Sequence, residues 1–278
     1  MDWNIDPVII KLFGALEIRY YSLLFASGLF FALNRVSKFM LAEGYPEEYP
    51  ERIFLYIVIS LILGAHFTHL IFYEPGSLLN IKRILAFGSG LASHGGVVGA
   101  LFGLWLFCYR NEVSLRSLYQ ITDMIAAVVG VTGGCIRLGN FFNSEIIGRV
   151  TDVPWAITFL RVDSKPRHPA QLYEAIALFT MAIVFYPLYL KQRDKREPGF
   201  FLYLFLAIYF VIRFLVEFIK EYQSEIVTSG ATLTMGQYLS IPIVIFTGYM
   251  VFQKAKRKEG EIVIPKEVKK TPAPKKKK

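Results

Sequence analysis

The sequence predicts an all-α polytopic membrane protein with about seven transmembrane helices and a small extracytoplasmic head. Hydrophobic residues make up 54% of the 278 residues and aromatic residues alone 15%, a composition too apolar for an ordinary soluble domain of this size. The apolar residues also gather in seven stretches. Each stretch is close to the roughly 20 residues that a helix needs to cross a bilayer core.

These stretches define the predicted helices and the domain organisation. Their approximate bounds are 20–38, 53–73, 91–109, 118–136, 171–190, 199–219 and 237–253. We expect a transmembrane domain over 1–254, with a head portion over about 145–165, and a basic, disordered tail over 255–278. Trp155 and the alternating run Val153 to Thr158 that contains it predict a short strand or hairpin in the head.

Basic residues favour one end of the predicted helices. They flank alternate connections and the end of the last stretch, at Arg35, Lys38, Arg52, Arg110, Arg116, Lys191, Arg193, Lys195, Arg196, Lys254, Lys256, Arg257 and Lys258. By the positive-inside rule these ends are cytoplasmic, so we expect the N-terminus outside and the C-terminus inside. Several basic residues run against the rule, and the arginines among them are therefore candidates for a site: Lys82, Arg83, Arg149, Arg161, Lys165 and Arg167. The lysine-rich tail is expected to be solvated near anionic lipid, without a nucleic-acid partner.

The N-terminal residues do not resemble a cleavable signal peptide. Met1 to Glu17 contains acidic residues early and lacks a basic region before a short apolar core. We therefore expect no cleaved leader in this segment.

A polar cluster directly after the apolar stretch Ile121 to Cys135 is the strongest candidate for a functional site. From Arg137 to Thr151 it reads Arg-Leu-Gly-Asn-Phe-Phe-Asn-Ser-Glu-Ile-Ile-Gly-Arg-Val-Thr. Polar groups at membrane depth are costly unless they are paired or wetted, so such a cluster indicates function. Its arginines carry fork-shaped donors suited to a phosphate, its asparagines offer neutral donors and acceptors, and Glu145 supplies a balancing charge.

A glycine-rich segment at 88–99 enters the third predicted helix and contains His94. A histidine at the mouth of a helix could act as a base. The glycine spacing by itself favours the alternative, in which small residues pack two helices together. Nothing around the segment resembles a βαβ unit, so nucleotide binding is rejected.

Two further constellations place charged groups near helix ends or inside a span. Pro166-Arg-His-Pro-Ala-Gln-Leu-Tyr-Glu174 starts the fifth predicted helix, and the i, i+3 spacing puts Gln171 and Glu174 on one face. Arg213 and Glu217 are four residues apart inside the sixth helix, where they form either a helix-locking ion pair or part of an anion site.

The remaining polar and sulfur-containing residues give weaker signals. His66 and His69 could bind a metal, but a third ligand at the usual spacing is missing, so a structural pair is favoured and no metal is expected. Cys108 and Cys135 are predicted near opposite membrane faces, which excludes a disulfide between them. Asp123 has no partner that the sequence identifies.

The motifs together resemble the prolipoprotein diacylglyceryl transferases of bacteria. The signature runs from Arg137 to Trp155, and further blocks follow the family's order from about Ile18 to Gly248. These blocks are His94-Gly-Gly, Arg167-His-Pro-Ala-Gln-Leu-Tyr-Glu, Arg213-Phe-Leu-Val-Glu-Phe and Met235-Gly-Gln-Tyr-Leu-Ser. A signature of this length is specific.

The resemblance implies that the diacylglyceryl group of phosphatidylglycerol moves to the lipobox cysteine thiol in the signal peptide of a preprolipoprotein. It also implies a multi-pass protein of the bacterial inner membrane that contacts membrane lipids and needs no cofactor. Thiolate formation needs a base, and a phosphate leaving group needs cationic donors. We expect Arg137 and Arg213 to bind phosphate and His94 to take the thiol proton. The expected positioning and substrate-binding residues are Asn140, Asn143, Glu145, Gly148, Tyr21, Tyr209, Arg167 and His168.

A lipid or small-anion transporter is the alternative, in which the same arginines bind without catalysis. Transporters of the repeat type show matching halves, and residues 1–140 and 141–278 show no internal repeat. An intramembrane protease is disfavoured because the sequence lacks a His-Glu-x-x-His motif, a Gly-x-Ser-x-Gly motif and a facing pair of membrane aspartates.

Overall fold

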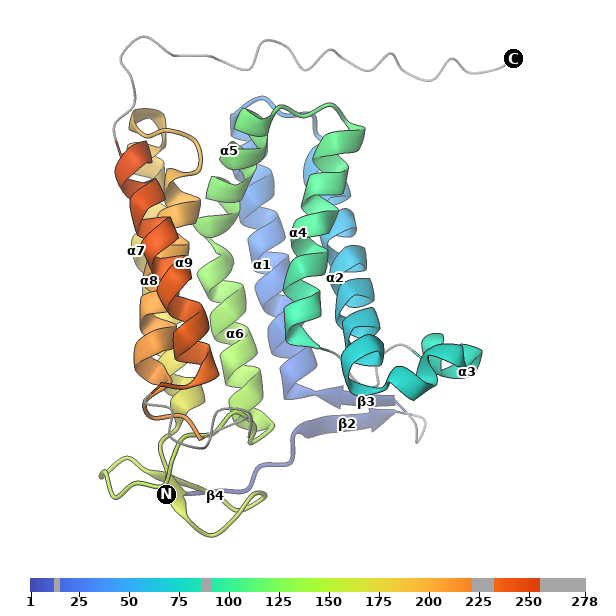
Figure 1. The fold of residues 1–278 in the computed structure, drawn as a ribbon, viewed down its shortest axis with the longest axis vertical. Coiled ribbons are helices and arrows are strands. Elements are labelled where there is room, and N and C mark those ends of the chain that lie inside the picture. Colours follow the sequence, from blue (N-terminus) through green and yellow to red (C-terminus); the bar gives the residue numbers. More distant parts are fainter. Residues whose placement is uncertain (13–15, 87–91, 222–232, 256–278) are drawn as a thin grey trace. The chain divides into compact units, whose positions relative to one another are not determined.

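The computed structural model describes residues 1–12, 16–86, 92–221 and 233–255, which are mostly helical (Figure 1). They divide into two compact units. The first unit holds the described residues of 1–36 and 119–259, and the second holds those of 37–118. Helices form in all seven apolar stretches that the sequence identifies.

The first unit contains most of the helices. They are the first part of α1 (Tyr20–Ala42), most of α5 (Leu115–Ala126), α6 (Val129–Phe142), α7 (Ala170–Gln192), α8 (Phe200–Val216) and α9 (Met235–Lys254). Helix α6 packs against α7, α7 against α8, and α8 against α9, as Figure 1 shows. A short 3₁₀ turn, η2 (Arg193–Lys195), follows α7.

The fourth predicted span is broken rather than continuous. Helices α5 and α6 meet at an angle of 47°. Near the break, the Asp123 carboxylate accepts the backbone N–H groups of Gly199 and Leu202 at 2.7 and 2.8 Å. These donors lie at the start of α8 and would otherwise have no intrahelical partner. Asp123, for which the sequence identified no partner, therefore caps α8.

By length and composition, three of the described helices qualify as membrane spans, or four if the bent pair counts as one span. The three are 20–42, 49–73 and 170–195. Of the remaining predicted spans, α4 (Ser93–Arg110) and α8 count as shorter apolar helices, and α9 is not among the helices that qualify. The mostly helical structure is consistent with a helical membrane protein, whereas the number of seven spans stays a prediction.

The second unit is built on a close helix pair. Helix α2 (Tyr49–Tyr73) packs against α4, and a Cβ atom added at Gly99 would lie 2.1 Å from the carbonyl oxygen of Ser60. The same close approach recurs at Gly95 and Gly103. The described glycines of α4 therefore pack helices, as the alternative interpretation proposed, while residues 88–91 lie outside the described ranges. The side chain of His94 lies outside the described residues, so this packing does not test its proposed role as a base.

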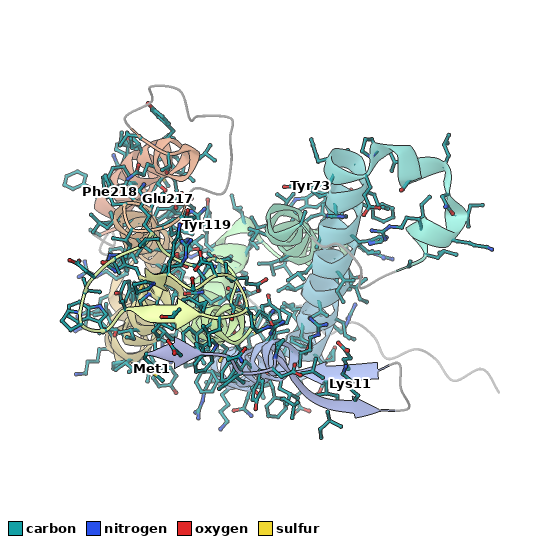
Figure 2. The ribbon with its side chains drawn as sticks, turned by 90° about the horizontal axis from the view of Figure 1, so that it is seen from below. Met1, Lys11, Tyr73, Tyr119, Glu217 and Phe218 are labelled. Carbon is teal, nitrogen blue, oxygen red and sulfur yellow. The ribbon has the colours of Figure 1, made fainter. Side chains whose placement is uncertain are left out.

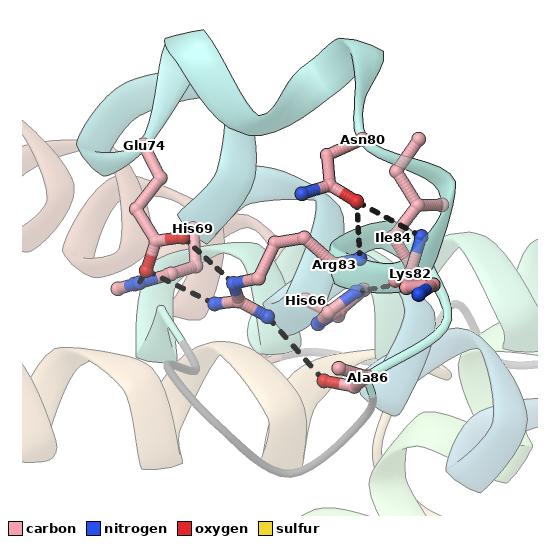
Figure 3. Close-up of polar contacts among 8 residues, drawn as sticks. All are labelled: His66, His69, Glu74, Asn80, Lys82, Arg83, Ile84 and Ala86. Atoms are coloured by element: carbon pink, nitrogen blue, oxygen red, sulfur yellow. Dashed lines mark hydrogen bonds and ion pairs between the residues drawn. The ribbon is translucent and has the colours of Figure 1, made fainter.

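The two histidines of α2 make polar contacts with the segment that follows this helix (Figure 3). The segment contains η1 (Pro75–Leu79) and α3 (Ile81–Ile84). His66 Nε2 lies 2.8 Å from the carbonyl oxygen of Ile84, and His69 contacts Glu74. Arg83 binds Glu74 through Nε and Nη2. Its guanidinium, followed by His69, lowers the pKa of the Glu74 carboxyl to about 2. These contacts support the structural reading of the histidine pair.

In the described ranges, the structure differs from the expected all-α fold by two small sheets. In the first, β1 (Asp2–Trp3) pairs in parallel with β4 (Ile157–Phe159), which pairs antiparallel with β5 (Pro166–Arg167). Met1 lies at this sheet in Figure 2, where its carbonyl accepts the Thr158 N–H. The second sheet is a hairpin of β2 (Val8–Leu12) and β3 (Leu16–Arg19), which the sequence analysis did not predict.

The short strand predicted in the run Val153 to Thr158 is present, but it begins later than expected. The run expected to be extended from Val153 begins with a turn, in which Ala156 N–H donates to the Val153 carbonyl. The strand starts only at Ile157. Phe159 is fully buried there and packs with Phe141, so one strand residue joins the head to the end of α6.

Candidate functional site

Arg137 occupies the second half of α6, and its guanidinium is bound on two sides. Its Nε forms an ion pair with Glu174 at the start of α7, and its Nη1 donates to Asn140 Oδ1 at 3.3 Å. The side chain of Arg137 is 15% exposed and that of Glu174 is 7% exposed. The packing of α6 on α7 therefore creates a nearly buried charge pair at one end of both helices.

A second cation shares the same carboxylate. Lys220 Nζ forms an ion pair with Glu174 Oε1, and the Lys220 side chain is 6% exposed. Glu174 thus lies between two cations that come from different parts of the chain. One carboxylate cannot neutralise both, and a buried charge excess is costly unless it serves an anion.

Glu145 accepts hydrogen bonds from polar residues at the end of α6 and the start of α7. Asn140 Nδ2 and Asn143 Nδ2 both donate to Glu145 Oε1, at 2.6 and 3.2 Å. Gln171 Nε2 donates to the Glu145 backbone carbonyl at 2.7 Å. The structure therefore brings three of the predicted positioning residues together, and it connects them to Arg137 through Asn140.

The backbone beside Glu145 adopts the left-handed region twice. Ser144 has φ of 56° and Ile146 has φ of 57°. A β-branched residue with positive φ is an outlier that costs on the order of 1–3 kcal/mol, and such strain gathers at functional sites. The loop that carries Glu145 is therefore held in place by its surroundings rather than by local preference.

Gly148 is required by close contacts. Its N–H donates to the His168 carbonyl at 3.0 Å, and an added Cβ would lie 2.5 Å from that oxygen and 2.8 Å from the Ile219 carbonyl. Arg149 N–H donates to Ile219, and Glu221 N–H donates to Ile147. The signature segment thus lies between the residues before α7 and those after α8, which places Lys220 beside α7.

Arg213 lies in a small pocket with Glu174, Leu178, Tyr209 and Ile212. Among the described residues, its guanidinium has neither an ion pair nor a hydrogen bond. The helix-locking pair with Glu217 is not formed there. The Glu217 carboxylate instead packs against Gly236, where an added Cβ would lie 2.7 Å from Oε1. Glu217 is labelled near the end of α8 in Figure 2. Of the two alternatives for this pair, the geometry favours the anion site.

Arg167 belongs to a separate network. Its guanidinium binds the Asp163 carboxylate, the Glu221 carboxylate and the Gly148 carbonyl. The Asp163 carboxylate, followed by Glu221, raises the Arg167 pKa, and Arg167 in turn lowers the Asp163 pKa. The adjacent His168 contacts the Tyr173 hydroxyl through Nδ1 at 3.2 Å, and Trp155 Nε1 donates to that hydroxyl. These contacts give both residues a visible structural role.

The remaining predicted residues divide between the two units. Tyr21 packs its ring on α6, where a Cβ at Gly139 would lie 2.6 Å from Tyr21 Cδ2. Tyr209 lines the pocket that contains Arg213. His94 belongs to the second unit, and its function as a base remains a prediction.

From the sequence, Glu174 was expected on a helix face with Gln171 but without a role, and Lys220 was not among the expected site residues. The signal for Glu174 was available, since it shares a buried face with Gln171 as predicted. Lys220 gave no such signal, because its partner is 46 positions earlier in the chain and only the fold brings the two together.

The fold and this cluster define a class: a helical membrane protein with an excess of buried cations, suited to an anionic, membrane-borne ligand. The family model for prolipoprotein diacylglyceryl transferase matches residues 7–253. The chain belongs to this family.

Several relatives share most of the chain. A protein of Bacteroides fragilis is 43% identical over 93% of this chain and 96% of its own length. A protein of Tolumonas auensis is 37% identical over 92% and 98%, and one of Chloroherpeton thalassium is 38% identical over 93% and 96%. All three are named phosphatidylglycerol–prolipoprotein diacylglyceryl transferase. These comparisons do not favour the transporter alternative.

Proposed function

We propose that this chain transfers the diacylglyceryl group of phosphatidylglycerol to the lipobox cysteine of a preprolipoprotein. In this reaction a sulfur–carbon bond forms at the diacylglyceryl carbon, and the carbon–oxygen bond to the phosphate breaks. The glycerol phosphate leaves with the electron pair of that bond, and the thiol proton passes to a base. The family membership and the names of the relatives support this reaction.

The observation that carries the mechanism is the cation excess around Glu174. Arg137 and Lys220 pair with this carboxylate, while Arg213 shares a pocket with it and has no partner in the part of the chain that the structure describes. In our proposal Arg213 binds the phosphate first. Arg137 then binds the phosphate through the guanidinium N–H groups that are not engaged by Glu174 and Asn140. Both cations stabilise the charge that develops on the leaving phosphate.

Lys220 acts in this proposal through Glu174. A carboxylate bound only to Arg137 would cancel the charge that the phosphate needs. Since Lys220 also binds Glu174, the negative charge is shared and Arg137 keeps part of its attraction for the substrate. Glu174 then holds the guanidinium in one orientation, which reduces the reorganisation needed when the lipid binds.

The strained loop positions the headgroup. Glu145 holds the amide nitrogens of Asn140 and Asn143, and Asn140 Oδ1 accepts from Arg137, which leaves Asn143 Oδ1 for a glycerol hydroxyl of the lipid. The buried Asn143 Oδ1 has no hydrogen-bond partner among the described residues, which is consistent with an unfilled acceptor at this position. Tyr21 and Tyr209 are proposed to line the same site, and His94 is proposed as the base.

The membrane arrangement of this proposal follows the charge pattern. We propose seven spans in the bacterial inner membrane, with the N-terminus and the head near 145–165 outside and the tail inside. The signal peptide and the lipid donor then reach the site from the bilayer. Surrounding membrane lipids contact the exposed apolar faces of the helices.

The decisive experiment supplies purified protein with phosphatidylglycerol and a synthetic lipobox peptide, and measures the peptide by mass spectrometry. The proposal predicts a mass increase equal to one diacylglyceryl group, and no increase for the peptide whose lipobox cysteine is replaced by serine. Phosphatidylglycerol that crosses a vesicle membrane without modifying the peptide would instead indicate the transporter.

A further inference from the structure

An apolar groove lies in the first unit, and none of its lining residues belongs to the candidate site. It is lined by Phe31 of α1, by residues of 127–131 at the break between α5 and α6, and by residues of 179–187 in α7. Its volume of about 410 Å³ is in the range of small-ligand pockets, roughly 300–1,000 Å³. Apart from the hydroxyl of Tyr186, the lining side chains are apolar, so the groove suits a hydrocarbon chain.

Two interruptions in the helices lie at this groove. The 47° bend between α5 and α6 directs α6 away from the line of α5, and Pro187 removes one backbone donor inside α7. Ala127 and Ala182 add little volume at the same level. Irregular backbone at membrane depth is tolerated where it is buried in protein or lines a cavity, and this groove provides that setting.

A cation lies at the groove. The guanidinium carbon of Arg35 is 5.5 Å from the centre of the Phe31 ring and 5.9 Å from the centre of the Tyr186 ring, and both rings line the groove. Within the described ranges, Arg35 has neither an ion pair nor a hydrogen bond. The aromatic contacts orient the guanidinium but leave its hydrogen-bond donors available for an acceptor.

We propose that this groove binds one anionic phospholipid, with an acyl chain along the apolar lining and the phosphate on Arg35. The acyl chain of such a lipid is complementary to the apolar lining, and its phosphate is complementary to Arg35. Basic pockets between membrane helices favour anionic headgroups. A zwitterionic lipid would place its own cation beside Arg35. By the positive-inside pattern, Arg35 lies at the cytoplasmic end, so this lipid belongs to the inner leaflet and is separate from the proposed donor.

Native mass spectrometry of the full-length protein, released from nanodiscs of equal parts phosphatidylglycerol and phosphatidylcholine, tests the proposal. The wild type should retain one phosphatidylglycerol. Arg35→Gln should lower that occupancy by about fivefold, the effect of one basic residue on anionic lipid, and Arg35→Lys should lower it less. Arg110→Gln is the matched control, since Arg110 is an exposed arginine among the residues predicted to be cytoplasmic. It should retain the lipid.

A second variant tests the groove without changing charge. Val131→Phe places a larger side chain in the lining and should also displace the lipid, while the melting temperature and diacylglyceryl transfer of both variants stay near wild type. Equal retention by the wild type, Arg35→Gln and Val131→Phe would overturn the proposal. So would equal retention of the two lipids by the wild type, which would indicate non-specific annular lipid only. Absence of transfer with retained lipid would count against the proposed enzyme activity alone.

Discussion

Arg167 and Arg213 are the same residue type in two motifs of one family, yet the structure uses them differently. Arg167 is surrounded by two carboxylates and a carbonyl oxygen, which occupy its fork. Arg213 has no such partner among the described residues and lies in a pocket beside Glu174. A saturated guanidinium, whose hydrogen-bond donors are paired within the protein, stabilises the fold. An unsaturated guanidinium, whose donors are unpaired, is available to a ligand.

The largest effect is expected at Arg213. Arg213→Ala should lower diacylglyceryl transfer by about 10²–10³-fold, because it removes a charged donor that stabilises the leaving phosphate. Its melting temperature should stay near wild type, since no described hydrogen bond or ion pair of the side chain is lost. Arg213→Lys keeps the charge but not the fork, so it should recover only part of the rate. Normal transfer by Arg213→Ala at normal expression would remove this residue from the mechanism.

The opposite pattern is expected at Arg167. Arg167→Met should destabilise the protein by roughly 1.5–3 kcal/mol, because it removes charge-assisted hydrogen bonds and leaves the Gly148 carbonyl without this donor. Transfer by the protein that remains folded should change little. Thermal unfolding in detergent, with activity normalised to folded protein, separates the two effects. A variant of normal stability with no activity would instead assign Arg167 to the substrate.

A smaller effect is expected at Lys220, which acts through Glu174. Lys220→Met should raise the KM for phosphatidylglycerol by about tenfold, equivalent to ~1.4 kcal/mol, with a smaller change in kcat. Lys220→Arg should behave like the wild type. Glu174→Gln added to Lys220→Met should restore part of the affinity, because the uncompensated carboxylate is gone. If the double variant is worse than Lys220→Met, charge balance at Glu174 is the wrong explanation.

The smallest effect is a pH dependence of the Arg167 network. The pKa of Asp163 is lowered in the folded protein, chiefly by Arg167. Its contribution to stability is therefore complete above the ordinary aspartate pKa of about 3.9 and is lost as the pH falls through the lowered value. The melting temperature of the wild type should fall over this acidic range more steeply than that of Asp163→Asn. Parallel curves would show that Asp163 contributes no linkage.

The sequence predicted the helical architecture well because hydrophobicity and length specify a span almost locally. All seven stretches form helices, from α1 to α9. The break between α5 and α6 could not be predicted in this way, since an apolar run looks the same whether it is straight or bent. The cap that Asp123 provides to α8 depends on residues 76 to 79 positions away.

The candidate site was predicted in its parts rather than in its connections. Asn140, Asn143 and Glu145 were expected together because they are neighbours in the chain, and the structure joins them by hydrogen bonds. The ion pairs of Glu174 with Arg137 and Lys220 required the tertiary fold. Residue type likewise could not distinguish Arg167 from Arg213, because that distinction depends on which oxygen atoms surround each guanidinium.

The most direct test of the account measures phosphatidylglycerol binding by the wild type, Arg213→Met and Arg167→Met in mixed micelles, without peptide so that no transfer occurs. The account predicts that Arg213→Met binds at least about tenfold more weakly, a loss of ~1.4 kcal/mol or more, whereas folded Arg167→Met binds like the wild type. Unchanged binding by Arg213→Met together with weakened binding by folded Arg167→Met would contradict the assignment of the unsaturated arginine to the lipid phosphate.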